Sequence, residues 1–480
     1  MLWRRLLSAR AWCAAATLGC TFTVSTARSD DAKPAVASAK PVAPVVVKSD
    51  ASKSAQPVAA PVAKPFAETE TIGVLEGQRQ GALKVEARGK GRDHVSIAVE
   101  NTTNKRLNVI FPPGLVAAMS VGQAAGGRAG GGQSMGLGSI DNQGNAFGQF
   151  RRPGGDAAAA GFRSVGTEPV SVARGVVTVP AGKRIELVSS SACLNFGLAT
   201  PTPRDRFTLM DVNDYSNDPR VRKALRSLST YGTSQGVAQA ALWNVCNGLS
   251  FETMSQHVGQ SFNMSELALA ARFVEAVDAS NGAELVDPTY LTEGRLFVRV
   301  VGEGKAASQA ARLGKSLDGM TILGLRVRAL APNEGISAIS PALSLNVTLT
   351  TGNAGETRGK VAVNALAINN QQWMPVGRAS FRDGSEPSHL EAADLARAID
   401  HAVASALVTV RPYRRGTGVT TLRVENKLPF TIDTVTIKAA GVNGSAAHAL
   451  VGLGVGPGRA ALAPIEASSG AVDRVTLNGL

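Results

Sequence analysis

Short stretches in which apolar and polar residues alternate, separated by turn residues, constrain the fold of this chain more than any other feature. In the first half of the chain they cover residues 94–100, 106–111, 175–179 and 184–188. A period of two residues places one face of each stretch in a core, as in a half-buried β-strand. Short strands joined by turns predict an N-terminal β-sandwich in a mainly β protein.

After residue 290 the alternation resumes and leads into a strongly helical pattern. Apolar residues repeat at helical spacing up to about Leu407, and Ser388 with Glu391 has the spacing of a capping box. A sheet with one helix packed on it predicts an α+β middle domain. Its predicted strands cover residues 296–301, 320–330, 342–350 and 360–368.

Small helices are predicted between these two β regions. Asp218-Pro219 provides a helix N-cap followed by proline at the first helical position, and Gly232 is a stop signal. A later helix is predicted to start at Asn263, because Glu266 stands in capping-box position.

The C-terminal segment returns to short strands and repeats a pattern from the N-terminal region. Val99-Glu100-Asn101 closes a predicted strand before a second strand, and Val424-Glu425-Asn426 does the same. This recurrence suggests related β-sandwich modules at both ends of the folded region.

The first residues have the layout of a secretory signal. Arg4 and Arg5 precede a small and apolar stretch, and Ser25-Thr26-Ala27 offers a cleavage site. Cys20 also stands in a loose lipoprotein box, so a lipid anchor there is an alternative. We therefore expect an exported protein in the periplasm, at the cell surface or outside the cell, with no transmembrane helix in its mature form.

Two segments have compositions that disfavour a packed core. Residues 28–67 repeat Ala, Pro, Val and Lys, and the pattern predicts a disordered linker. Residues 122–161 are rich in glycine, whose backbone is costly to order, and are predicted to be a disordered insertion in the sandwich.

Charge and motifs indicate neither nucleic acid nor a cofactor as a partner. The chain has 50 Lys and Arg against 37 Asp and Glu, but no long basic run. The five histidines are far apart and match no metal-binding spacing. Gly314-Lys315-Ser316 matches the last three residues of the phosphate-loop motif. Gln309, however, stands at the position where that motif requires its first glycine. We predict no metal and no cofactor.

Gly-x-Ser-x-Gly occurs twice, around Ser134 and around Ser234. A nucleophile elbow needs a strand before the serine and a helix after it. Ser134 lies in the Gly-rich stretch, whereas Ser234 lies between two predicted helices and is expected to cap the second. An exported serine hydrolase is therefore only the second alternative for the function.

Cys193 and Cys246 remain after removal of the signal, and a cysteine pair in an exported protein predicts a disulfide. Cys193 also precedes Gln239 by 46 residues, and Gln239 lies in the segment Ala238-Gln239-Ala240-Ala241-Leu242-Trp243. Over residues 193–243 this resembles the internal-thioester domains of bacterial surface adhesins. Alanine replaces the threonine of the family's glutamine motif, and alanine rather than an aromatic residue precedes the cysteine.

The resemblance implies that the thiol of Cys193 displaces ammonia from the carboxamide of Gln239 and that a surface amine later attacks the resulting thioester. Trp243 would shield the bond from water. Cys246 lies on the same predicted helix face as Gln239, so Cys193 can join only one of them. A disulfide, a thioester and two free thiols all stay open.

We expect a non-enzymatic protein of the cell envelope or surface with a structural or adhesive role, binding an unidentified protein or polysaccharide. A covalent thioester adhesin is the alternative. The predicted layout is a signal peptide (1–27), a linker (28–67), a β-sandwich (68–200), a helical domain (201–290), an α+β domain (291–412) and a β-sandwich-like domain (413–480).

Overall fold

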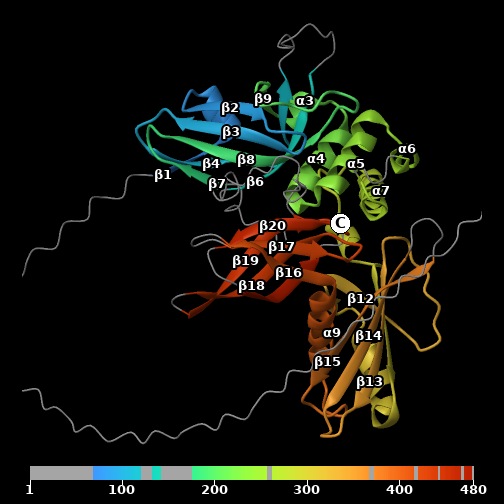
Figure 1. The fold of residues 1–480 in the computed structure, drawn as a ribbon. Helices are drawn as coiled ribbons and strands as arrows, with labels where there is room; N and C mark the ends of the chain where they lie inside the picture. Colours follow the sequence, from blue (N-terminus) through green and yellow to red (C-terminus); the bar gives the residue numbers. More distant parts are fainter. Residues whose placement is uncertain are drawn as a thin grey trace, which may run out of the picture. The chain divides into compact units, whose positions relative to one another are not determined.

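The structure is a computed structural model, and its described residues all belong to one compact unit, Pro65–Leu480. The signal peptide, the linker and the Cys20 anchor predicted from sequence lie outside those residues. The fold is mainly β with several sheets, as expected from the alternation (Figure 1). The described residues are 69–119, 132–141, 176–256, 262–366, 372–415, 420–441, 444–465 and 470–477.

The N-terminal region holds a closed six-stranded barrel where the sequence predicts a sandwich. Both architectures bury one face of each strand, so alternation does not distinguish them. Beside the barrel lies a sheet of three strands in the order β1-β4-β7, and α1 (Val74–Arg79) follows β1. The barrel strands in order are β2 (Leu83–Gly89), β3 (His94–Asn101), β8 (Arg184–Cys193), β6 (Met135–Asp141), β5 (Leu115–Met119) and β9 (Arg206–Asp211); the separate sheet consists of β1 (Thr69–Gly73), β4 (Arg106–Ile110) and β7 (Val176–Val179).

Strand β6 corrects part of the predicted disordered insertion 122–161. Gly136 in this strand is a packing position, because a Cβ there would lie 2.5 Å from the side chain of Leu225. Glycine here allows a helix to approach the barrel closely. The other residues of the predicted insertion lie outside the described ones.

Helices α4, α5 and α7 form the centre of the helical region, and α5 packs against β8 (Figure 1). Two predicted helix starts are confirmed: Asp218 caps α4 with Pro219 at the first position, and Asn263 with Glu266 forms the capping box of α7. The helices are α3 (Val212–Tyr215), α4 (Pro219–Tyr231), α5 (Gln235–Asn247), α6 (Phe251–Ser255) and α7 (Met264–Ala279), followed by the short 3-10 helix η2 (Pro288–Leu291).

The middle region is a six-stranded mixed sheet with helices α8 and α9 packed on it. Helix α8 carries the Gly314-Lys315-Ser316 sequence and connects β10 to the hairpin of β11 and β12. Helix α9 starts at Ala392 with Glu391 as an N-cap that makes no side-chain bond, so the predicted Ser388–Glu391 capping box is wrong. The strand order is β11 (Thr321–Ile322), β12 (Leu325–Leu330), β10 (Leu296–Gly302), β13 (Leu343–Thr351), β14 (Thr357–Leu366) and β15 (Trp373–Asp383); the helices are η3 (Gly304–Ala306), α8 (Ala307–Ser316) and α9 (Ala392–Leu407).

The C-terminal region has two three-stranded sheets, ordered β16-β17-β20 and β19-β18-β21. The triplet β16-β17-β20 repeats the antiparallel order of β2-β3-β8, and the pair β18-β19 repeats the antiparallel pair β4-β7. The strands are β16 (Val408–Arg415), β17 (Thr420–Asn426), β18 (Ile432–Gly441), β19 (Gly444–Val455), β20 (Ala460–Ile465) and β21 (Gly470–Leu477).

Each copy of the recurring Val-Glu-Asn sequence ends in a buried asparagine that ties two turns together. The side-chain amide of Asn101 donates to the carbonyl oxygens of Lys105 at 2.8 Å and Val179 at 3.1 Å, and its oxygen accepts from the backbone N–H of Thr103 at 2.9 Å. Its own backbone N–H donates to Lys183 at 2.9 Å. One side chain therefore fixes the β3–β4 turn against the β7–β8 turn.

Asn426 makes the same set of contacts in the C-terminal region. Its amide donates to Phe430 at 2.6 Å and Val455 at 3.0 Å, and its oxygen accepts from the backbone N–H of Leu428 at 3.0 Å. Its backbone N–H donates to Arg459 at 2.9 Å. The sequence recurrence thus corresponds to a recurrence of strand order and of atomic contacts.

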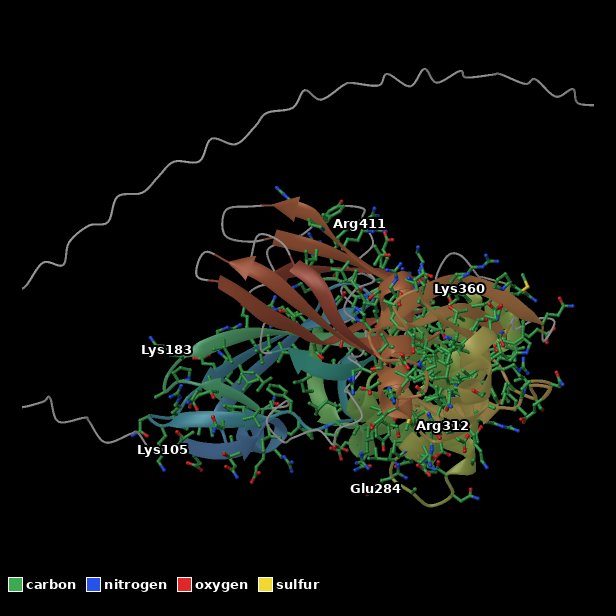
Figure 2. The ribbon with its side chains drawn as sticks, turned by 90° about the horizontal axis from the view of Figure 1, so that it is seen from below. Lys105, Lys183, Glu284, Arg312, Lys360 and Arg411 are labelled. Carbon is green, nitrogen blue, oxygen red and sulfur yellow. The ribbon has the colours of Figure 1, made fainter. Side chains whose placement is uncertain are left out.

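Charged side chains are spread over the described surface rather than gathered in one place. The labelled basic residues lie in the β3–β4 and β7–β8 turns, on helix α8, on the middle strand β14 and on the C-terminal strand β16 (Figure 2). This distribution matches the scattered positive charge of the sequence. The residues are Lys105, Lys183, Arg312, Lys360 and Arg411.

Candidate functional site

Cys193 is the last residue of β8, and its side chain belongs to the core of the barrel. Side chains alternate along a strand, so the neighbouring Ala192 and Leu194 join the larger core that contains the helices, whereas Cys193 joins the barrel core. The thiol donates to the carbonyl oxygen of Arg92 at 3.7 Å. Cys193 therefore presents its backbone, and not its sulfur, to helix α5.

Helix α5 meets this backbone with side chains spaced four residues apart, which lie on one helix face. The carboxamide of Gln239 binds the backbone of Cys193 twice: Oε1 accepts from N–H at 2.9 Å and Nε2 donates to C=O at 2.8 Å. Gln235 donates to the carbonyl of Ser191 at 2.8 Å, and the amide oxygen of Asn247 accepts from the N–H of Phe196 at 2.9 Å. These bonds satisfy backbone groups at the point where β8 ends.

Trp243 completes this face of α5. Its ring lies edge-on to Phe196 with centroids 4.9 Å apart and to Phe262 with centroids 5.6 Å apart. Phe196 is 46% exposed, so Trp243 holds an otherwise solvent-facing aromatic side chain against the helix. These edge-on ring pairs add an aromatic contact beside the hydrogen bonds between α5 and the end of β8.

The structure holds both Cys193 and Cys246 as free thiols. Cys246 packs at the edge of the helix core, while Cys193 belongs to the barrel core. Burial raises the pKa of Cys193 to about 11 and the pKa of Cys246 to about 12. A thiol with such a pKa is almost fully protonated at neutral pH and is a poor nucleophile.

The sequence-predicted partners Cys193 and Gln239 are thus brought together, but through backbone atoms. A thioester requires the sulfur to leave the Arg92 carbonyl and reach the carboxamide carbon of Gln239. The thioester and the Cys193–Cys246 disulfide both stay predictions, to be decided by the mass measurement proposed below.

The two Gly-x-Ser-x-Gly serines are buried. Ser234 is 3% exposed and occupies the N-cap position of α5 as predicted, but its hydroxyl makes no cap bond and has no hydrogen-bond partner. A Cβ on Gly456 would lie 2.9 Å from that hydroxyl, so the β19–β20 turn covers it. Ser134 is 7% exposed and its backbone N–H donates to Asn195 at 2.9 Å. Neither hydroxyl is presented in the way a nucleophile elbow requires.

Glu266 is a buried carboxylate that pairs with a distant arginine, whereas the sequence motifs identify it only as a capping residue. It is 1% exposed, and its carboxylate accepts from the guanidinium of Arg459 at 3.0 Å and 2.7 Å. The same carboxylate accepts from the N–H of Asn263, whose side chain donates to the carbonyl of Pro457. Helix α7 is therefore bound to the β19–β20 turn through an ion pair whose carboxylate is buried and whose guanidinium is half-buried.

The described residues contain no group of three or more His, Cys, Asp or Glu side chains placed to hold a metal ion. His94 contacts Asp93 at 2.9 Å, His401 lies exposed on α9, and His257 is outside the described residues. Among the described helices, none combines the length and apolar character needed to cross a membrane. The chain matches no protein-family model, and it matches no curated protein.

Proposed function

We propose that this chain is an exported, non-enzymatic protein of the cell envelope or surface with a structural or adhesive role. One observation carries the proposal. The side chains that the sequence motifs mark as candidate reactive groups are buried within the fold, and two of them hydrogen-bond to the backbone. Gln239 binds the backbone of Cys193, the thiol of Cys193 binds the Arg92 carbonyl, and Ser234 lies beneath a turn. Such contacts stabilise a scaffold and leave these groups no access to a substrate.

A continuous apolar core supports a mechanical role. One cluster of buried residues joins Val116 of the barrel, Leu242 of α5, Leu345 of the middle sheet and Phe430 of the C-terminal region. Regions that share a core resist separation better than regions joined by linkers alone. A proposed stalk at residues 28–67 would hold this body away from a membrane or wall.

The proposed layout keeps the predicted order of regions, and the β-sandwich-like domain predicted at 413–480 gains the start of β16 (Val408–Arg415), which pairs in the first C-terminal sheet. The strands β19 and β20 of the two C-terminal sheets contact one another, in support of that arrangement. The closed barrel takes the place of the sandwich predicted at residues 68–200, and its last strand β9 (Arg206–Asp211) lies beyond that predicted boundary.

Cell fractionation and binding assays test the leading proposal. The tagged chain should be recovered from the envelope or medium, and the purified exported form should bind whole cells, wall polysaccharide or an immobilised surface protein. Retention in the cytoplasm would contradict export, and binding to none of these would contradict adhesion. Labelling by a serine-directed fluorophosphonate that is lost in Ser234→Ala would establish an enzyme instead.

A covalent adhesin is the second candidate, favoured by the direct contact between Gln239 and Cys193. In this reaction the Cys193 sulfur bonds to the carboxamide carbon of Gln239 and ammonia leaves with the thiol proton. A surface amine then attacks the same carbon, forming an amide and returning the thiol. The partner would be an amine on a protein or wall surface.

Intact mass of the exported form separates the three states of Cys193. The leading proposal expects the sequence mass, unchanged by reductant or methylamine. A deficit of one ammonia that methylamine converts into a mass one methylene above the sequence value, and that is absent in Gln239→Ala, would establish the thioester. A deficit of two hydrogens that reductant reverses would establish the Cys193–Cys246 disulfide.

A further inference from the structure

A pocket of about 640 Å³ lies beside the C-terminal half of α7, away from Cys193 and Gln239. Its lining comes from α7, from η2 and the segment before it, and from Arg295 just before β10. Ala276, Ala279, Leu285 and Val286 give it an apolar wall. A volume of this size is typical of pockets for small molecules.

Arg295 is the unusual residue of this pocket. It is only 3% exposed, and its Nε donates to the carbonyl of Tyr290 at 2.8 Å. Its Nη1 is buried without a hydrogen-bond partner, and so is the hydroxyl of Tyr290. The ion pairs found among the described side chains do not include Arg295. The residues that line the pocket therefore include two hydrogen-bond donors without a partner, Nη1 of the Arg295 guanidinium and the hydroxyl of Tyr290.

A buried cation without a counter-ion is costly to a fold. Burial, together with the charge of the nearby Arg272, lowers the pKa of Arg295 to about 10, so the group still carries its charge at neutral pH. Arg272 itself is paired with Glu275 at 2.6 Å. Arg295 is thus the member of this pair of arginines that lacks an anion.

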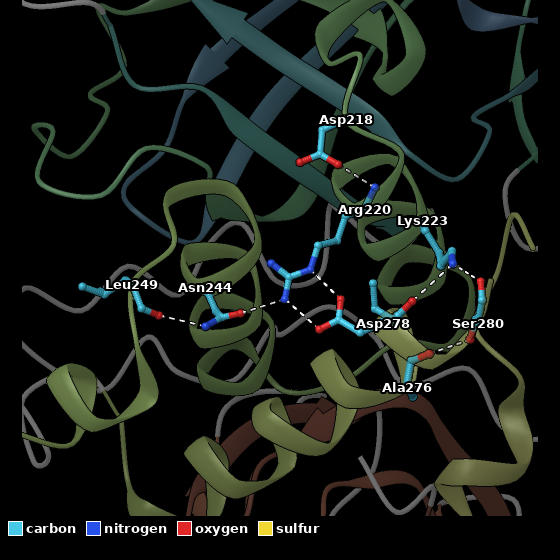
Figure 3. A network of polar contacts seen from close by, with 9 residues as sticks. Asp218, Arg220, Lys223, Asn244, Leu249, Ala276, Asp278 and Ser280 are labelled. Atoms are coloured by element: carbon cyan, nitrogen blue, oxygen red, sulfur yellow. Dashed lines mark hydrogen bonds and ion pairs between the residues drawn. The ribbon is translucent and has the colours of Figure 1, made fainter. Parts of the chain in front are cut away.

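The walls of the pocket are held in place from α4. Lys223 donates to the carbonyl oxygens of Val277 and Ser280 at the end of α7, and Arg220 forms an ion pair with Asp278 at 2.6 Å (Figure 3). On the opposite wall, the backbone N–H of Val286 donates to Ser227 at 3.0 Å and its carbonyl accepts from Tyr231 at 3.0 Å. These bonds preform the pocket, which reduces the entropy cost of binding.

We propose that this pocket binds a small organic carboxylate, with the carboxylate group at Arg295 and Tyr290 and the apolar body against Ala276 and Leu285. A planar guanidinium is well suited to a carboxylate. The acidic residues Glu275 and Asp287 also line the pocket and disfavour a doubly charged phosphate. The inference is independent of the proposed envelope role.

Thermal shift and calorimetry on the full chain test this site with benzoate, hexanoate, benzamide and inorganic phosphate as probes. Benzoate or hexanoate should raise Tm in a concentration-dependent way, whereas benzamide, which has the shape of benzoate without its charge, should not. Absence of any shift with both carboxylates at tens of millimolar would overturn the proposal. A response to phosphate alone would overturn it as well.

Variants locate the binding. Arg295→Met should abolish the shift, and the exposed Arg326, which pairs with Glu293 at the surface, provides the control Arg326→Met with unchanged binding. Tyr290→Phe removes only the hydroxyl and should weaken binding about tenfold, so it tests the site even where Arg295→Met does not fold. Undiminished carboxylate binding in Tyr290→Phe and in a folded Arg295→Met would place the ligand elsewhere and overturn the assignment.

Discussion

Asn101 and Asn426 make the same hydrogen bonds in two parts of the chain that are more than 300 residues apart. Each amide donates to the residue four positions on and to the end of a later strand, and each amide oxygen accepts from the residue two positions on. Each later turn also carries a glycine in the left-handed region, Gly182 at φ 60° and Gly458 at φ 64°. The recurrence indicates that the two ends of the folded region share one structural device.

Replacing either asparagine by alanine should destabilise the protein. Asn101→Ala leaves several buried backbone groups without a partner, and we expect a loss of about 2–4 kcal/mol in the free energy of unfolding. Asn426→Ala should have a similar effect because its contacts are equivalent. Denaturant unfolding measures both, with Asn104→Ala, an exposed neighbour in the same turn, as the control expected within about 0.5 kcal/mol.

Local signals explain which features could be predicted from the sequence. The caps at Asp218 and Asn263 depend on residues within one turn, so their pattern is sufficient, and the Val-Glu-Asn recurrence marked the two equivalent turns. Ser388 and Glu391 match a cap by spacing, but the helix begins one residue after Glu391. Spacing alone does not fix where the backbone enters a helix.

Features that depend on distant contacts could not be predicted in the same way. Glycine at position 136 indicated disorder, yet Gly136 pairs with Val116 of β5 and Ala192 of β8 in the barrel, and its missing side chain leaves room for Leu225. The resemblance placed Gln239 near Cys193, but which atoms meet depends on the face of β8 that turns toward α5. The burial of Arg295 has no local signal, since arginine is usually exposed.

Gln239 should contribute to stability through its two bonds to the Cys193 backbone. Gln239→Ala leaves a buried N–H and C=O unpaired, and we expect a loss of about 2–3 kcal/mol in the free energy of unfolding. The exposed Gln256→Ala is the matched control. A Gln239→Ala protein as stable as the control protein would show that the carboxamide has no structural role.

Stability should fall in alkaline solution because the thiol of Cys193 resists ionisation in the folded state. Burial raises its pKa from the ordinary value of 9.0 to about 11. Between these values the unfolded chain has lost the thiol proton and the folded chain retains it, so unfolding becomes more favourable as pH rises above about 9. We expect Cys193→Ala to lose less stability than the unsubstituted protein between pH 8 and 11, by an amount on the order of 2 kcal/mol. Equal pH profiles for the two proteins would contradict this assignment.

The ion pair between Glu266 and Arg459 should control how firmly the C-terminal region is attached. Arg459→Ala leaves a carboxylate that is 1% exposed without its cation, and we expect a loss of about 3–5 kcal/mol in the free energy of unfolding. The same change should speed proteolysis of the C-terminal strands, because the β19–β20 turn loses its bond to α7. Arg411→Ala is the control, since Arg411 pairs with Glu425 at the surface, where an ion pair contributes about 0–1 kcal/mol. Equal protease sensitivity of the two variants would show that other contacts, and not this ion pair, hold the C-terminal region in place.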